Sequence, residues 1–164
     1  MKGNKQESTF PLWEGVVSEY LFIRLDRRKS DTDNYISIWV AFNSWMKGNF
    51  GTKMTDKQLI NATKEYEPIK NNFHYLKLND IDFVTALESF AGYEVINEKT
   101  SELVRYQGTF DSLLDTLYTI RSNILHGTDL TQGMNNEFHK LASEILYVLL
   151  HKQIYPNQIC TFPL

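Results

Sequence analysis

The chain has 164 residues, of which 42% are hydrophobic and 23% are charged; this composition predicts one folded domain and excludes extensive disorder. Its formal net charge of −3 excludes a protein that coats nucleic acid through bulk positive charge, so any contact with RNA must come from a local patch. Cys160 is the only cysteine, which excludes an intramolecular disulfide and a multi-cysteine zinc site and fits a reducing, cytoplasmic setting.

Neither a signal peptide nor a membrane association is expected. The N-terminal segment Met1–Glu7 lacks the apolar run of a signal peptide. The longest apolar stretches are far shorter than the ~20 residues that a membrane-spanning helix needs. We predict a disordered polar tail over residues 1–9 and a single helical domain over residues 10–164.

Two apolar helices are predicted in the first part of that domain. The first runs from about Leu12 to Lys29 and carries one apolar stripe. Residues 30–33 form a break rich in N-cap residues, so the second helix should start near Asp33 or Asn34. Residues 35–46 of this second helix are apolar nearly all round, which predicts a central place in a helical bundle.

Shorter and more polar helices are expected in the middle of the chain. Thr55 should open a helix that continues to about Tyr66 and that Pro68 ends. A short helical piece over residues 72–78 follows, and Asn79 or Asp80 then caps a helix that reaches Ala91. Residues 92–108 could form a β-hairpin or a long loop, and we expect them to be irregular.

Two strongly amphipathic helices close the chain. Thr109 begins the first, and Gly127 stands where a C-terminal glycine cap belongs. The second runs from about Asn135 to Lys152, and the matched apolar stripes predict that the two helices pack antiparallel. The expected fold is therefore all-α, a single-domain bundle of five or more helices with a hairpin or irregular insertion near 92–108. The buried face expected for the first helix consists of Phe110, Leu113, Leu114, Leu117, Ile120, Ile124 and Leu125.

The end of that first helix contains the residues best suited to chemistry. Arg121 and His126 are five residues apart, about 140° around a helix, and can flank a groove at the helix end. A ribose 2′-OH can attack its own phosphodiester when a base takes its proton and a cation stabilises the phosphorane. Histidine can act as that base or as an acid, and arginine can hold two phosphate oxygens. The pair therefore suits metal-independent cleavage of RNA.

Three neighbouring polar residues are candidate supporting groups. Ser122 and Asn123 precede His126 by four and three residues, so both can touch its imidazole. Asn43 falls on the inner face of the apolar second helix, where a buried amide needs partners. It either orients Arg121 or His126 or forms an interhelical structural bond. The motif itself has a plain alternative, in which Arg121 makes a salt bridge within the bundle and His126 merely ends a helix.

The segment Arg121-Ser-Asn-Ile-Leu-His126-Gly127 resembles the R-x4-6-H motif of the HEPN superfamily, whose members are helical bundles. In that family the motif lies near the end of the penultimate long helix and an amphipathic helix follows it, as expected here. The run Ile-Trp-Val-Ala-Phe-Asn at residues 38–43 also resembles the second-helix pattern of HEPN families from prokaryotic defence and toxin–antitoxin systems. The expected order of helices resembles that of HEPN proteins over residues 12–152, but only the motif segment, residues 121–127, is specific to the family.

This resemblance implies an endoribonuclease that uses no metal or cofactor, with Arg121 at the scissile phosphate and His126 in an acid–base or phosphate-stabilising role. It also implies a homodimer in which two motifs form one composite site, in a toxin or defence effector whose partner is an antitoxin protein. The family commonly places Asn, Asp or His directly after its arginine, whereas this chain has Ser122 there and Asn123 next. The alternative function is a non-catalytic HEPN module that binds RNA or a partner protein.

Three arginines near the N-terminus form a further candidate site. Arg24, Arg27 and Arg28 share one helix face and either follow an RNA backbone or form a solvated helix end. The remaining histidines are His74, His139 and His151, and none has the spacing of a metal ligand. We expect them to be surface or structural residues, and we expect His139 to face away from the apolar stripe of the last helix.

Overall fold

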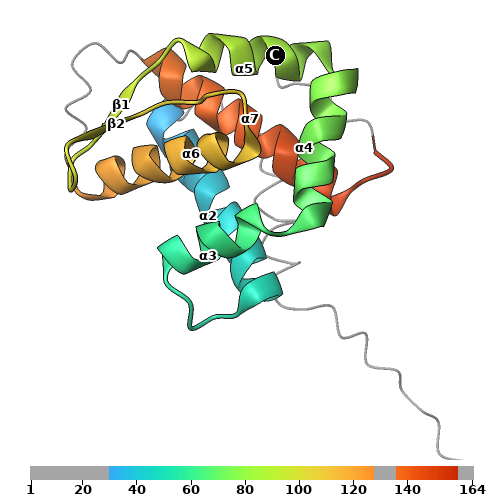
Figure 1. Ribbon diagram of the computed structural model, residues 1–164, viewed down its shortest axis with the longest axis horizontal. Helices are drawn as coiled ribbons and strands as arrows, with labels where there is room; N and C mark the ends of the chain where they lie inside the picture. Colours follow the sequence, from blue (N-terminus) through green and yellow to red (C-terminus); the bar gives the residue numbers. More distant parts are fainter. Residues whose placement is uncertain (1–29, 128–135, 159–164) are drawn as a thin grey trace, which may run out of the picture.

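The computed structural model describes residues 30–127 and 136–158, which form six helices and one two-stranded antiparallel sheet (Figure 1). This arrangement confirms the predicted all-α class and the bundle of five or more helices. The expected tail over residues 1–9 and the expected helix over residues 12–29 lie outside the described residues. The irregular structure expected for residues 92–108 is wrong, because Val95–Asn97 and Glu102–Val104 pair as a β-hairpin, the alternative.

Helix α2 (Asp31–Phe50) occupies the central place that its sequence predicted. Its N-cap is Ser30, whose side chain accepts a hydrogen bond from the Asp33 amide, so the helix begins before the predicted start near Asp33 or Asn34. It packs most extensively on α7 and also on α3, and the Tyr35 hydroxyl donates to the Leu117 carbonyl of α6. Its fully or nearly buried side chains include Tyr35, Ile38, Trp39, Phe42, Trp45 and Met46. Aromatic packing around this helix therefore forms the centre of the core.

Helices α3 (Asp56–Lys64), α4 (Glu67–Asn79) and α5 (Ile81–Ala91) follow. The predicted starts at Thr55 and Asp80 are confirmed, because the side chain of each accepts a hydrogen bond from a first-turn amide. Pro68 does not end a helix as predicted. It stands in the first turn of α4, where its missing N–H leaves no helical hydrogen bond unmade. The short piece expected over residues 72–78 is thus the second half of a longer helix.

Strands β1 (Val95–Asn97) and β2 (Glu102–Val104) form the hairpin, which lies along α6 (Phe110–Leu125). In Figure 1 the turn of the hairpin lies near the C-terminal end of α6. The Asn123 side-chain amide fixes this arrangement by donating to the Ile96 carbonyl over 2.8 Å. Helix α7 (Asn136–Ile154) is the last element of the bundle.

Three expectations about the last two helices are wrong. α7 packs mainly on α2, α4 and α5, while α6 packs on α3 and the hairpin, so the two are not the closely packed antiparallel pair expected. Leu125, expected on the buried face of α6, is 55% exposed, since α6 ends beside it. His139, expected to face away from the core, is buried, stacks on Tyr35 and shares a 2.8 Å hydrogen bond with Thr32.

Glu144 gives the fold a testable dependence on pH. It is buried on α7, and this burial raises the pKa of its carboxyl. The positive charge of Lys140, 3.9 Å away, lowers that pKa, while the negative charge of Asp31 raises it further. The folded state therefore favours the protonated form. That contribution to stability is fully present below the unfolded pKa and is lost as the pH rises through the raised folded value.

We expect Glu144→Gln, which stays neutral, to gain stability relative to the wild type as the pH rises toward 7. Urea unfolding at several pH values between about 4 and 7 measures this difference. A difference that moves in favour of the wild type as the pH rises would contradict the expected direction of the shift.

Candidate functional site

The two motif residues lie at the C-terminal end of α6 in different environments. Arg121 lies in the last turns of the helix, and its side chain is 23% exposed. His126 is the C-cap residue and is exposed. Its backbone amide donates to the carbonyls of Ser122 and Asn123, and Gly127 then adopts a φ of +69°, which ends the helix. The helix thus presents an imidazole to solvent and keeps a guanidinium half-buried.

An ion pair holds the guanidinium of Arg121 in place. Its Nη2 lies 2.6 Å from Oδ2 of Asp56, a carboxylate that is 24% exposed in the first turn of α3. The other oxygen of Asp56 accepts a hydrogen bond of 3.1 Å from the Asn43 side chain of α2. Three helices therefore meet at this carboxylate. Asn43 bridges α2 to α3 and, through Asp56, also reaches Arg121.

The remaining donors of Arg121 are not equivalent. Its Nε–H is buried and finds no hydrogen-bond partner among the described residues. The second terminal nitrogen, Nη1, makes no ion pair with a described residue, so only one edge of the guanidinium is committed to Asp56. An arginine has five N–H donors in a fixed planar fork. Several donors therefore remain for an anion that reaches this end of α6.

The charge of Arg121 is felt at the buried Tyr35. Complete burial raises the pKa of the Tyr35 phenol well above its ordinary value, and the positive charge of Arg121 acts in the opposite direction. The Tyr35 hydroxyl donates to the Leu117 carbonyl over 2.5 Å, so the phenol is neutral and hydrogen-bonded. The charge of the guanidinium thus acts on a neutral, buried phenol of α2.

Two of the expected supporting residues border the hairpin and a groove. Asn123 is buried and holds the hairpin through the Ile96 carbonyl, and Ser122 lines a groove between α3 and α6. Asp56 was not foreseen from the sequence. In the sequence Asp56 is an ordinary acidic residue in the first turn of a helix, and its distance from Arg121 along the chain does not indicate an ion pair.

The other candidates add no second site. Arg24, Arg27 and Arg28 lie outside the described residues. His74 is exposed, and His151 packs between Tyr147 and Tyr155, with its pKa lowered by burial and then by Lys152. Within residues 30–127 and 136–158, no group of three His, Cys, Asp or Glu side chains could hold a metal ion. No helix of that same part is long and apolar enough to span a membrane.

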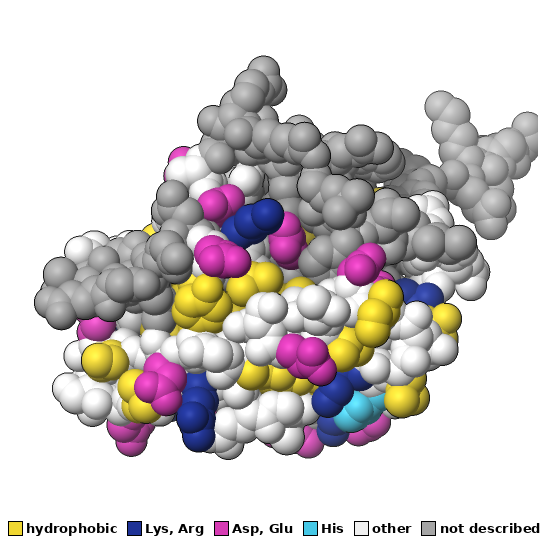
Figure 2. Space-filling view, turned by 90° about the horizontal axis from the view of Figure 1, so that it is seen from above, with side chains coloured by type: hydrophobic (Ala, Val, Ile, Leu, Met, Phe, Trp, Pro, Cys, Tyr) yellow, Lys and Arg dark blue, Asp and Glu magenta, His cyan; other side chains and the backbone are white. Residues whose placement is uncertain are grey.

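Basic charge on the surface is local. On the face shown in Figure 2, the Lys and Arg side chains are few and stand close to Asp and Glu side chains. No continuous basic field covers the described part of that face. Binding of an anionic polymer would therefore depend on individual cationic side chains in defined places, in line with the overall charge of −3.

Comparison with known proteins finds no relative of this chain. No protein-family model, no curated protein and no solved structure matches it. What the chain does has to be inferred from the geometry around Arg121 and His126.

Proposed function

We propose that the chain is a metal-independent endoribonuclease of HEPN type that acts as a homodimer. The observation that carries the proposal is the arrangement on α6, where Asp56 holds a half-buried Arg121 and an exposed His126 ends the same helix. A cation fixed by its neighbours can bind a phosphate without losing much side-chain entropy. An exposed imidazole can exchange a proton with a bound ribose.

The chemistry needs one base, one acid and one cation. A histidine takes the proton of the ribose 2′-OH as this oxygen attacks the adjacent phosphorus, and the P–O5′ bond breaks. The leaving 5′-oxygen receives a proton from a second acid, which in a dimer is His126 of the other copy. Arg121 stabilises the charge on the non-bridging phosphate oxygens. The products are a 2′,3′-cyclic phosphate and a 5′-hydroxyl.

Exposed apolar side chains near the motif support the dimer. Leu125, next to His126, is 55% exposed, and the cross-strand pair Ile96 and Leu103 on the hairpin is 59% and 57% exposed. Asn123 ties this hairpin to the same end of α6. Large side chains left open to water near one another are typical of protein interfaces. A two-fold interface there would bring two copies of the motif together.

We expect the purified protein to cleave single-stranded RNA in the presence of EDTA and to leave DNA of the same sequence intact. The 2′-hydroxyl is the nucleophile in this mechanism, and DNA lacks it. Gel analysis and mass spectrometry of the products measure the cleavage and should find cyclic phosphate ends. Cleavage that needs added Mg²⁺, or full activity from a species that sediments only as a monomer, would contradict the proposal.

A second function is favoured by one specific observation. The 2.6 Å ion pair with Asp56 already satisfies part of the Arg121 charge, as expected for an arginine that joins two helices of a bundle. In that case the chain would be a non-catalytic HEPN module that binds RNA or a partner such as an antitoxin protein. Toxicity on expression that is relieved by His126→Ala, with the fold retained, would favour the toxin.

A further inference from the structure

A groove of about 560 Å³ lies between α3, α6 and the β-hairpin. Residues from three separate segments line it, among them Lys57 of α3, Lys99 of the hairpin turn and Tyr118 of α6. Its volume is within the range of small ligand sites, roughly 300–1,000 Å³, and is too small for a nucleic-acid duplex. The groove suits a single extended chain or a small molecule.

The groove adjoins the candidate site on two sides. Lys57 lines it and directly follows Asp56, while Ser122 lines it and directly follows Arg121. The two partners of the ion pair are therefore the chain neighbours of two groove residues. Neither Asp56 nor Arg121 lines the groove itself, so a ligand would meet the guanidinium only where it leaves the groove beside Ser122.

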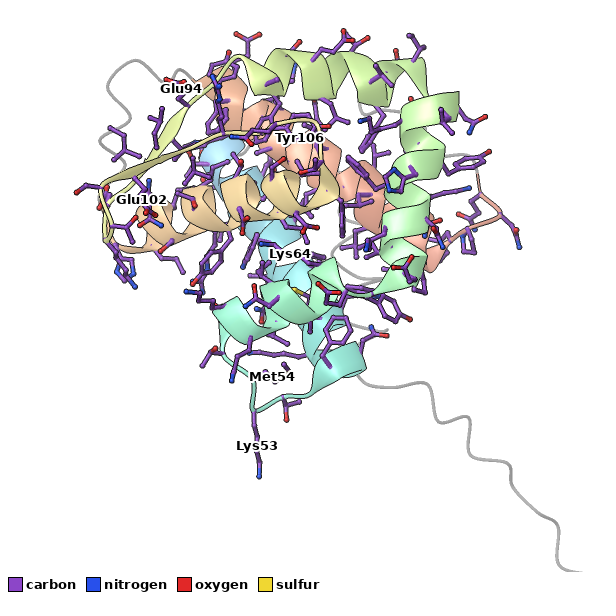
Figure 3. All side chains as sticks on the ribbon, in the orientation of Figure 1. Lys53, Met54, Lys64, Glu94, Glu102 and Tyr106 are labelled. Carbon is purple, nitrogen blue, oxygen red and sulfur yellow. The ribbon has the colours of Figure 1, made fainter. Side chains whose placement is uncertain are left out.

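The charges in the groove favour an anion. Two carboxylates line it, but Asp115 is paired with Lys64 at 2.5 Å, and Figure 3 shows Lys64 pointing between α3 and α6. Lys57 and Lys99 are exposed and make no ion pair with another described residue. Glu102, near the hairpin turn in Figure 3, is the one lining carboxylate without an ion pair among the described residues.

The wall formed by α6 adds an aromatic ring. Tyr118 is half-buried, and its ring packs on Trp39 with centroids 6.3 Å apart, so its orientation is fixed from behind. Nucleobases stack on such rings irrespective of sequence. Lining positions on α6 extend from Ser112 to Ser122, about 15 Å along the helix, which is long enough for a short single-stranded segment.

We infer that this groove binds the single-stranded RNA segment next to the scissile phosphate, an inference that rests on the proposed function for its choice of RNA. Lys57 and Lys99 contact phosphates, and Tyr118 provides a stacking surface for a base. The combination of spaced cations with one fixed ring is the pattern by which proteins hold single strands without reading sequence. An acidic peptide would use the lysines but not the ring.

The test measures binding of fluorescent octauridylate by anisotropy, with every protein carrying His126→Ala to prevent cleavage. Lys57→Gln with Lys99→Gln should lower the slope of log affinity against log salt by about 1.4, and weaken binding roughly 25-fold at 0.1 M salt. Tyr118→Leu should weaken binding roughly 5- to 150-fold. Glu102→Gln should strengthen it, because it removes a carboxylate that repels phosphate.

Matched variants outside the groove serve as controls. Lys47→Gln with Lys53→Gln removes the same charge as the lysine pair of the groove, and Figure 3 shows Lys53 in the α2–α3 loop, pointing away from the rest of the protein. Glu88→Gln on α5 is the control for Glu102→Gln. Thermal unfolding of each variant verifies its fold. Equal loss in the groove and control lysine pairs, or equal affinity for octaglutamate, would overturn the inference. If the wild-type protein does not cleave RNA but RNA binding still depends on Lys57 and Lys99, the groove is supported as an RNA-binding site and the proposed endoribonuclease function is wrong.

Discussion

Replacing His126 with alanine is expected to lower the rate of RNA cleavage by about 10²–10⁴, the range for losing a general acid or base. The fold should be kept, because His126 is exposed and caps α6 through its backbone amide, which alanine retains. Initial rates on a fluorogenic RNA measure the loss. Circular dichroism and urea unfolding on the same samples measure the stability, which should change by less than about 0.5 kcal/mol.

His74→Ala provides the matched control. It removes another exposed imidazole, from α4, and should leave the cleavage rate unchanged. Equal rates for wild type and His126→Ala would show that the imidazole takes no part in the reaction. A mixed dimer of wild-type and His126→Ala chains should also cleave slowly, because it keeps one imidazole where the mechanism uses one as base and one as acid.

Helix starts were predictable from the sequence because they depend on neighbours along the chain. Thr55, Asp80 and Thr109 each accept a hydrogen bond from an amide three residues later. This local bond needs no knowledge of the tertiary fold. The apolar spacing of residues 35–46 was equally informative, because a helix without a polar face must be covered on most sides.

Contacts between distant segments were not predictable in the same way. Asp56 and Arg121 belong to separate helices, and only the packing of α3 on α6 brings their side chains within 2.6 Å. The neighbours of α7 could not be predicted either, because the apolar stripes of α6 and α7 are each able to pack on several other helices. The prediction that Pro68 ends a helix was wrong for a simpler reason. A proline that ends one helix cannot be distinguished in the sequence from a proline in the first turn of the next helix.

The Asp56–Arg121 pair is the point at which the two proposed functions diverge. An ion pair between partly exposed groups contributes little to stability, typically about 0–1 kcal/mol. If Arg121 serves only the bundle, its exact shape matters little and any cation of similar length should suffice. If it stabilises a phosphorane, the planar fork of donors matters greatly. Stability and activity must therefore be measured on the same variant.

Arg121→Lys is expected to reduce RNA cleavage by about 10²–10³, comparable to losing one preorganised donor at a developing oxyanion. Lysine keeps the charge, so an ion pair with Asp56 can persist and the free energy of unfolding should change by less than about 1 kcal/mol. Lys70→Arg is the control, because Lys70 is also ion-paired, to Glu67 at 3.2 Å, but lies on α4 and does not line the groove. It should cleave RNA at the wild-type rate. Wild-type cleavage by Arg121→Lys would instead show that the planar guanidinium takes no special part in the reaction and would assign Arg121 to the ion pair with Asp56.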